Sequence, residues 1–204
     1  MVTRPDDARW LLVLAHGAGA GMTHPFLEAL AASLAARGVA SFRYQFPYME
    51  RGSRRPDPAP LLEATVRSAI EVAAGVSGDL PLLAGGKSMG GRMTSRAAAR
   101  EPLEGVRGLV FFGFPLHAVG KPGIERADHL ADVSAPMLFL QGSRDRLVDL
   151  SLLEPLVERL GARATIHVVV DADHSFHVPT RSGRTDAEVL DELSEQTAHW
   201  AAGF

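Results

Sequence analysis

The sequence predicts an α/β protein built on a doubly wound, mainly parallel sheet of about six strands flanked by helices. Short apolar runs alternate along the chain with longer segments of helical periodicity, as in parallel strands joined by crossover helices. The runs are rich in Leu, Val and Phe, as expected of strands that are buried on both faces. The length of 204 residues, of which 46 % are hydrophobic, suits one globular domain spanning residues 1–204.

Strands and helices are expected to alternate from the first apolar run onward. The predicted strands are Trp10–Ala15, Val39–Tyr44, Leu80–Ala84, Val106–Phe112, Pro136–Gln141 and Thr165–Val170. The predicted helices are Pro25–Arg37, Ala59–Ala74, Ser88–Arg100, Leu150–Leu160 and Asp186–Ala202. Glycine fixes two of the helix ends, because Gly38 and Gly161 stand directly after periodic segments.

Two longer connections interrupt this alternation. The segment Gln45–Pro58 is rich in aromatic residues, arginine and proline, and Gly113–Val133 contains prolines and glycines without a clear period. The second segment occupies the position where many α/β folds insert a lid, but about twenty residues are too few for a separate domain. We expect an irregular loop with at most one helical turn, and therefore no large lid.

The composition excludes several kinds of site and partner. The chain has no cysteine, which excludes disulfides, zinc–thiolate sites, iron–sulfur clusters and a cysteine nucleophile. A net charge of −3 gives no sign of nucleic-acid binding. No stretch approaches the ~20 apolar residues of a membrane span, and the run Trp10–Ala15 is too short for a signal-peptide core. We therefore expect a cytoplasmic protein with neither nucleic-acid nor membrane partners.

The segment Leu82–Arg92 carries the most informative motif. A predicted strand is followed by the pattern G-x-S-x-G at residues 86–90 and then by a predicted helix. A serine hydroxyl is a poor nucleophile and must be held out at a tight strand-to-helix turn, where a base can reach it. We expect glycine at 86 and 90 because side chains there would collide across the turn. Ser88 is therefore the predicted nucleophile.

The base that activates a nucleophilic serine is expected in a loop at the carboxyl end of a late strand. His174 is the first histidine after the predicted strand Thr165–Val170, and it is the predicted general base. The alternative is His177, which would otherwise contact the substrate or lie on the surface.

The acid that orients the histidine is expected at the end of the preceding strand. Asp145 follows Pro136–Gln141 and is the predicted acid, whereas Asp149 suits the N-cap of the next helix. Asp171 and Asp173 are alternatives, but they are too close to the histidine in sequence to reach its far nitrogen. The resulting chain order, Ser then Asp then His, is that of α/β-hydrolases.

Acyl transfer also requires N–H donors for the oxyanion that develops on the carbonyl oxygen. One predicted donor is the N–H of Met89, the residue after the nucleophile. The other is expected in the small-residue loop His16–Gly21, from Ala18 or alternatively from Gly19. His16 itself is expected to bond within this loop and to take no part in the chemistry.

Two glycine-rich segments also bear comparison with nucleotide-binding motifs. Residues 86–88 resemble the end of a phosphate-binding loop, but Pro81 stands where that motif requires glycine. The G-x-G at 17–19 follows a strand, but Met22 replaces the third glycine of a dinucleotide fingerprint, and Arg43 replaces the acid near the end of the next strand. Both nucleotide-binding alternatives are therefore disfavoured.

Taken together, these residues resemble the α/β-hydrolase superfamily and, within it, the dienelactone-hydrolase-like branch. Over nearly the whole chain the sequence is most similar to a small hydrolase group that includes a testis-expressed protein and a subunit of a nuclear acetyltransferase complex. The segments that carry this resemblance are His16–Gly21, Phe46–Glu50, Arg54–Pro58, Gly85–Arg92 and Asp173–His177. The resemblance implies a minimal α/β-hydrolase fold, in which the superfamily's first two strands are missing.

The resemblance and the motifs together predict a serine hydrolase that acts on a small ester or related acyl substrate through an acyl-enzyme, without a metal or organic cofactor. Dienelactone hydrolases proper use cysteine in place of Ser88, so their substrate is not implied. The candidate pocket-wall residues are His24, Phe46, Tyr48 and Phe176. The alternative is a non-catalytic interaction or scaffold protein that retains the fold, as in the nuclear-complex subunit. Acyl transfer to an acceptor other than water is a third possibility.

Overall fold

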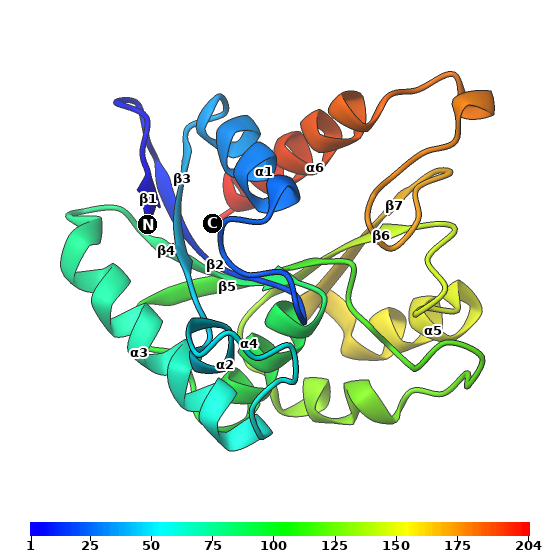
Figure 1. The fold of residues 1–204 in the computed structure, drawn as a ribbon, viewed down its shortest axis with the longest axis horizontal. Coiled ribbons are helices and arrows are strands. Elements are labelled where there is room, and N and C mark those ends of the chain that lie inside the picture. Colours follow the sequence, from blue (N-terminus) through cyan, green and yellow to red (C-terminus); the bar gives the residue numbers. More distant parts are fainter.

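The computed structural model describes residues 1–204, whose strands form one seven-stranded sheet (Figure 1). The strands are β1 (Val2–Thr3), β2 (Trp10–Ala15), β3 (Val39–Tyr44), β4 (Leu82–Lys87), β5 (Val106–Phe112), β6 (Met137–Gly142) and β7 (Ala164–Val169). Their order is β1-β3-β2-β4-β5-β6-β7, and every neighbouring pair is parallel except β1 with β3. The carboxyl ends of β2 to β7 therefore meet at one edge of the sheet, where open α/β sheets bind ligands.

Helices cover both faces of the sheet. The α-helices are α1 (Pro25–Ala35), α2 (Pro47–Glu50), α3 (Ala59–Ser77), α4 (Met89–Arg100), α5 (Leu150–Leu160) and α6 (Asp186–Ala201), and the 3₁₀ helices are η1 (Glu125–Asp132), η2 (Gly161–Arg163) and η3 (Thr180–Ser182). The pair α1 and α6 packs over one face, and α3, α4 and α5 cover the other (Figure 1). No helix combines the length with the apolar character that crossing a bilayer requires.

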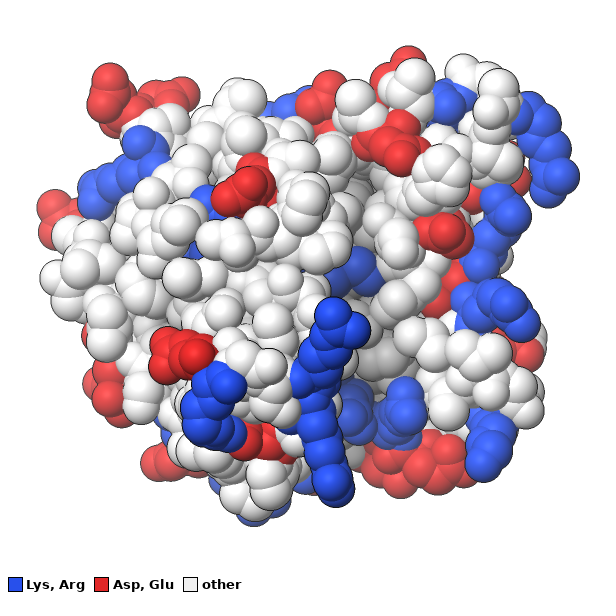
Figure 2. Space-filling model, in the orientation of Figure 1, with Lys and Arg blue, Asp and Glu red and all other residues white.

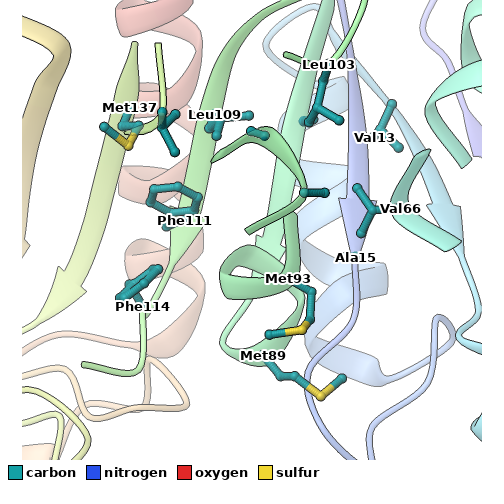
Figure 3. Close-up of a cluster of buried hydrophobic side chains, with 14 of the residues drawn as sticks. Val13, Ala15, Val66, Met89, Met93, Leu103, Leu109, Phe111, Phe114 and Met137 are labelled. Atoms are coloured by element: carbon teal, nitrogen blue, oxygen red, sulfur yellow. The ribbon is translucent and has the colours of Figure 1, made fainter. Parts of the chain in front are cut away.

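Alternate side chains of β2 to β7 enter two separate cores. On β2, Leu11, Val13 and Ala15 face the core shared with α3 and α4, whereas Leu12 and Leu14 face the core shared with α1 and α6. Figure 3 shows part of the first core, where side chains of β2, β5, β6, α3 and α4 meet. Burial on both faces explains why the strands read as unbroken apolar runs.

The predicted α/β class and doubly wound sheet are confirmed, with one additional strand and a more ordered loop. The added strand β1 pairs Val2 with Phe42 at the edge of the sheet, and two residues are too few to show a sequence period. The expectation of at most one helical turn in Gly113–Val133 is wrong, because η1 spans eight residues. Its buried Ala127 and Leu130 belong to the first core.

Strand β4 ends at Lys87, three residues later than predicted, because two glycines that argue against a strand are part of it. A Cβ atom added at Gly85 would lie only 1.9 Å from the carbonyl oxygen of Val110 on β5. Glycine therefore allows β4 to pass close to β5 just before the chain turns at Ser88.

Replacing Gly85 with alanine is expected to destabilise the protein by about 3 kcal/mol or more, because β4 and β5 would have to separate to admit a methyl group. Urea unfolding measures the change. The matched control is Gly75→Ala in α3, where no atom lies within 4 Å of an added Cβ and alanine is expected to stabilise the helix by up to ~1 kcal/mol. Equal stabilities for wild type and Gly85→Ala would contradict this close approach.

Candidate active site

Ser88 lies at the turn between β4 and α4 with a backbone conformation that side chains rarely adopt. Its φ is 52° and its ψ is −116°, a region that costs about 1–3 kcal/mol for a residue other than glycine. The N–H of Ser88 donates to the carbonyl oxygen of Phe112 at 3.1 Å, which ties the turn to β5. The strained turn presents the hydroxyl at the carboxyl edge of the sheet.

The glycines on either side of Ser88 are required by the end of β2. A Cβ at Gly86 would lie 2.4 Å from the carbonyl oxygen of Ala15, and one at Gly90 would lie 2.6 Å from that of His16. The predicted need for glycine at these two positions is confirmed, and the atoms nearest to each added Cβ belong to Ala15 and His16. At Gly91, which was not part of the prediction, an added Cβ would lie 2.8 Å from the carbonyl oxygen of Gly86 across the turn.

Three side chains from distant parts of the sequence form a hydrogen-bonded chain at this edge. The Nε2 atom of His174 is 2.9 Å from the Ser88 hydroxyl, and its Nδ1 atom is 2.7 Å from Oδ2 of Asp145. With the proton on Nδ1, His174 donates to the carboxylate and accepts from the hydroxyl, which is the arrangement that a general base requires.

The Asp145 carboxylate is buried, with 5 % of the residue exposed, and it is well supplied with donors. Gln141 Nε2 donates to it at 2.6 Å, and the N–H of Leu147 donates at 2.8 Å. Burial raises the pKa of the Asp145 carboxyl, but the bonds from His174, Leu147 and Gln141 outweigh burial and hold this pKa below its usual value. Asp145 is therefore ionised at neutral pH and fixes the orientation of the imidazole.

The alternative base does not reach the serine. His177 is exposed and pairs with Asp186 at 2.9 Å, and the hydrogen bond to that carboxylate raises its pKa. Its backbone N–H and that of Ser175 both donate to Oδ1 of Asp173. Asp173 therefore organises the loop around His174 and forms no hydrogen bond with its ring.

The other acids also bond away from the imidazole. Asp149 caps α5, as predicted, by accepting from the N–H of Ser151 at 3.0 Å. Asp171 has a φ of 62°, and its N–H donates to the Ser143 hydroxyl. Among the four carboxylates considered from the sequence, only that of Asp145 meets His174.

The two predicted oxyanion donors lie beside Ser88 with free N–H groups. Neither Ala18 nor Met89 donates its N–H to a protein acceptor, whereas the N–H of Gly19 donates to the Tyr48 hydroxyl at 3.1 Å. The alternative donor is therefore already engaged. His16 supports the same loop, as expected, because its Nδ1 bonds the carbonyl of Gly17.

Two hollows share Ser88, Ala18 and Leu147 at their rims. The histidine-side hollow, of about 350 Å³, is also lined by His174, Lys87 and other residues: Gly17, Ala20, His24, Phe26, Leu27 and Ser175. The arginine-side hollow, of about 360 Å³, is also lined by Pro56, Asp57, Ala59, Leu62, Met89, Arg92, Met93, Pro115 and Arg126. Figure 2 shows a hollow near the centre of one face with Lys and Arg side chains around it.

Only one of the four expected pocket-wall residues lines these hollows. His24 does so, whereas Phe46 and Tyr48 are completely buried and Phe176 is 2 % exposed. The expectation fails for these three because their rings are buried beneath the loops of the site and do not reach the surface of either hollow. Phe46 packs on the ring of His16 at a centroid distance of 4.9 Å, and Phe176 stacks on Phe26 at 5.8 Å.

Lys87, next to the serine, is a site residue that was not predicted from the sequence. There it entered only the comparison of residues 86–88 with a phosphate-binding loop. Its Nζ donates to the carbonyl oxygen of His174 at 2.5 Å and lies 5.3 Å from the centroid of the Phe176 ring. Burial lowers the pKa of Lys87 to about 8, although the negative charges of Asp145 and Asp173 act to raise it. The lysine thus ties the His174 loop to the turn that holds the nucleophile.

No group of three His, Asp or Glu side chains is arranged to ligate a metal ion. The polar groups at Ser88 instead consist of a hydroxyl, an imidazole, a carboxylate and two free N–H donors. This set can activate an oxygen nucleophile and stabilise a negative charge that develops beside it.

The lowered pKa of Lys87 predicts a rise in native stability with pH. Between about pH 8 and the ordinary lysine pKa of 10.5, the unfolded chain binds this proton and the native protein does not. The free energy of unfolding should therefore increase by on the order of 2–3 kcal/mol over this range. Lys87→Met should lack this increase in urea unfolding at pH 7.5 and pH 10. Lys121→Met, at the exposed second lysine, should keep it, and an undiminished increase in Lys87→Met would contradict the burial of this ammonium group.

Comparison with known proteins identifies the family. Residues 8–202 match the family described as alpha/beta hydrolase domain. The fold is similar to that of a dienelactone hydrolase from Anabaena variabilis, at a TM-score of 0.76 and 21 % identity over 100 % of this chain and 90 % of that one. It is also similar to that of an alpha-beta serine hydrolase homologue from Coxiella burnetii, at a TM-score of 0.77 and 20 % identity over 96 % of this chain and 89 % of that one.

A third structure, XC6422 from Xanthomonas campestris, is described as an α/β serine hydrolase without lid. It has a TM-score of 0.74 and 22 % identity over 98 % of this chain and 87 % of that one. The predicted resemblance to α/β-hydrolases is confirmed by the family match, and the likeness to a dienelactone hydrolase is confirmed for the fold. The nearer likeness to the group with the testis-expressed protein stays a prediction. The match over nearly the whole sequence shows that this chain belongs to the alpha/beta hydrolase domain family.

Proposed function

We propose that this protein is a serine hydrolase that cleaves a small ester or a related acyl compound through an acyl-enzyme. The observation that carries the proposal is the hydrogen-bonded chain from Ser88 through His174 to Asp145, with distances of 2.9 and 2.7 Å. The descriptions of similar folds as a serine hydrolase without lid and as an esterase domain support it. Two free N–H groups beside the hydroxyl supply the remaining requirement of acyl transfer.

The reaction begins when Nε2 of His174 takes the hydroxyl proton as Oγ of Ser88 attacks the substrate carbonyl carbon. The N–H groups of Met89 and Ala18 stabilise the negative charge on the carbonyl oxygen. His174 then gives its proton to the leaving oxygen, and the bond between that oxygen and the acyl carbon breaks. Water then gives a proton to the same imidazole and attacks the acyl carbon. The bond between that carbon and Oγ of Ser88 breaks, Oγ takes the proton back from His174, and the acid is released.

Asp145 stays ionised throughout and stabilises the imidazolium that forms in both steps. Its burial strengthens this interaction, because a charge pair in a site with little water is screened less than one at the surface. The bonds from Gln141 and Leu147 keep the carboxylate in place, so His174 retains the tautomer that accepts from Ser88.

Replacing Ser88 with alanine is expected to lower kcat for 4-nitrophenyl butyrate by ~10⁶-fold, because the nucleophile and its base act as a unit. Release of nitrophenolate measures this. The matched control is Ser68→Ala, at an exposed position of α3, which should retain full activity. Undiminished hydrolysis by Ser88→Ala would contradict the mechanism.

A fluorophosphonate probe separates catalysis from a scaffold role. The folded wild-type protein should form a covalent adduct on Ser88, detected by mass spectrometry of the peptide, and Ser88→Ala should form none. Absence of an adduct on the folded wild-type protein would favour the non-catalytic alternative.

Replacing Asp145 with asparagine is expected to lower kcat by ~10⁴-fold, because the amide favours the wrong tautomer of the histidine. The substitution should lower kcat far more than it changes KM, because the carboxylate does not contact the substrate. Asp149→Asn is the control, because asparagine caps a helix as well as aspartate does. Equal losses in the two variants would show that Asp145 acts through stability alone.

A further inference from the structure

The two hollows beside Ser88 have different roles if the proposed function holds, on which this inference rests. The leaving oxygen must approach Nε2 of His174 to receive its proton, and His174 lines only the histidine-side hollow. The leaving group therefore occupies that hollow. The acyl chain must extend the other way, past the N–H of Met89 and into the arginine-side hollow.

Arg92 is well positioned to meet such an acyl chain. It follows Ser88 by four residues, and its N–H donates to the Ser88 carbonyl oxygen at 3.1 Å, so its side chain leaves α4 about one turn from the nucleophile on the same side. Its Nε atom is buried without a hydrogen-bond partner. The rest of its guanidinium forms no hydrogen bond or ion pair with the protein, although it lines the hollow.

A second guanidinium lines the same hollow from η1. The Nη1 atom of Arg126 donates to the carbonyl oxygen of His117 at 3.1 Å, but no carboxylate lies within 4.0 Å of this side chain. Burial lowers the pKa of Arg92, and the positive charges of Arg126 and Arg96 lower it further. Two positive side chains thus line the same hollow.

No carboxylate forms an ion pair with Arg92 or Arg126. Arg96, on the same helix, pairs with Glu63 at 2.7 Å and shares this carboxylate with Arg100. The one acid that lines the arginine-side hollow is Asp57. Its Oδ1 atom pairs with Arg51 at 2.5 Å, whereas its Oδ2 atom is buried without a hydrogen-bond partner. The hollow therefore has two arginines without a carboxylate partner, beside the apolar side chains of Leu62, Met93 and Pro115.

We propose that the arginine-side hollow binds an acyl chain that ends in a negatively charged group, and that the substrate is a half-ester or half-thioester of a dicarboxylic acid. The apolar residues would contact the methylene groups of the chain. The guanidinium groups of Arg92 and Arg126 would receive the terminal carboxylate, whose two oxygens match their paired N–H donors.

The test compares two substrates that differ in one charge. These are 4-nitrophenyl hydrogen adipate, which ends in a carboxylate, and 4-nitrophenyl methyl adipate, in which that carboxylate is esterified. The wild-type protein should prefer the charged substrate by at least about tenfold in kcat/KM, since a hydrogen-bonded ion pair is worth one to two powers of ten. The preference should shrink as the salt concentration rises.

Variants assign the preference to the arginines. Arg126→Gln and Arg92→Gln should each lower the ratio of the two kcat/KM values by about tenfold, and Arg126→Lys should restore part of it because the charge is kept. Arg107→Gln, at an exposed position on β5, should leave the ratio unchanged. Using the ratio removes any general loss of folded protein from the comparison.

The possible outcomes separate this inference from the proposed function. Ser88-dependent hydrolysis without a preference for the charged substrate would overturn the anionic subsite and leave the hydrolase intact. So would a preference that survives in both glutamine variants. If neither substrate is hydrolysed in a Ser88-dependent way, the hydrolase proposal fails and the subsite falls with it.

Discussion

The close packing of the end of β2 against the turn after β4 is the contact on which the site depends. Carbonyl oxygens of Ala15 and His16 leave no room for a Cβ at Gly86 or Gly90, so the turn can approach β2 only with glycine at both positions. This approach holds Ser88 in its strained conformation. It also brings the loop that begins at His16, and therefore the N–H of Ala18, alongside the hydroxyl.

Much of this arrangement could be predicted from the sequence, because it depends on local patterns and on the rule that parallel strands end at one edge. The strands Trp10–Ala15, Val39–Tyr44 and Val106–Phe112 have their predicted bounds, since unbroken apolar runs between breakers are unambiguous in an α/β alternation. The same topology explains why Asp145 and His174, each just after a strand, meet at one point.

The remaining features arise from contacts between distant segments. The ends of β4 could not be predicted, because the need for Gly85 lies in a carbonyl oxygen of β5. The role of Lys87 depends on the path of a loop more than eighty residues later in the chain. Aromatic residues near the glycine loop were predicted to line the pocket, but Phe46 is part of the core. A sequence alone does not distinguish a ring that lines a pocket from one that packs beneath the loop.

The sharing of Ser88 by two separate hollows has a consequence for the sequence of events in a catalytic cycle of the proposed kind. The first product, an alcohol or thiol, departs through the space beside the imidazole while the acid remains tethered in the other. The second nucleophile then enters the vacated space, already within reach of the base. Turnover would thus proceed by ordered release, and any acceptor small enough to refill that space would compete with water for the bound acid.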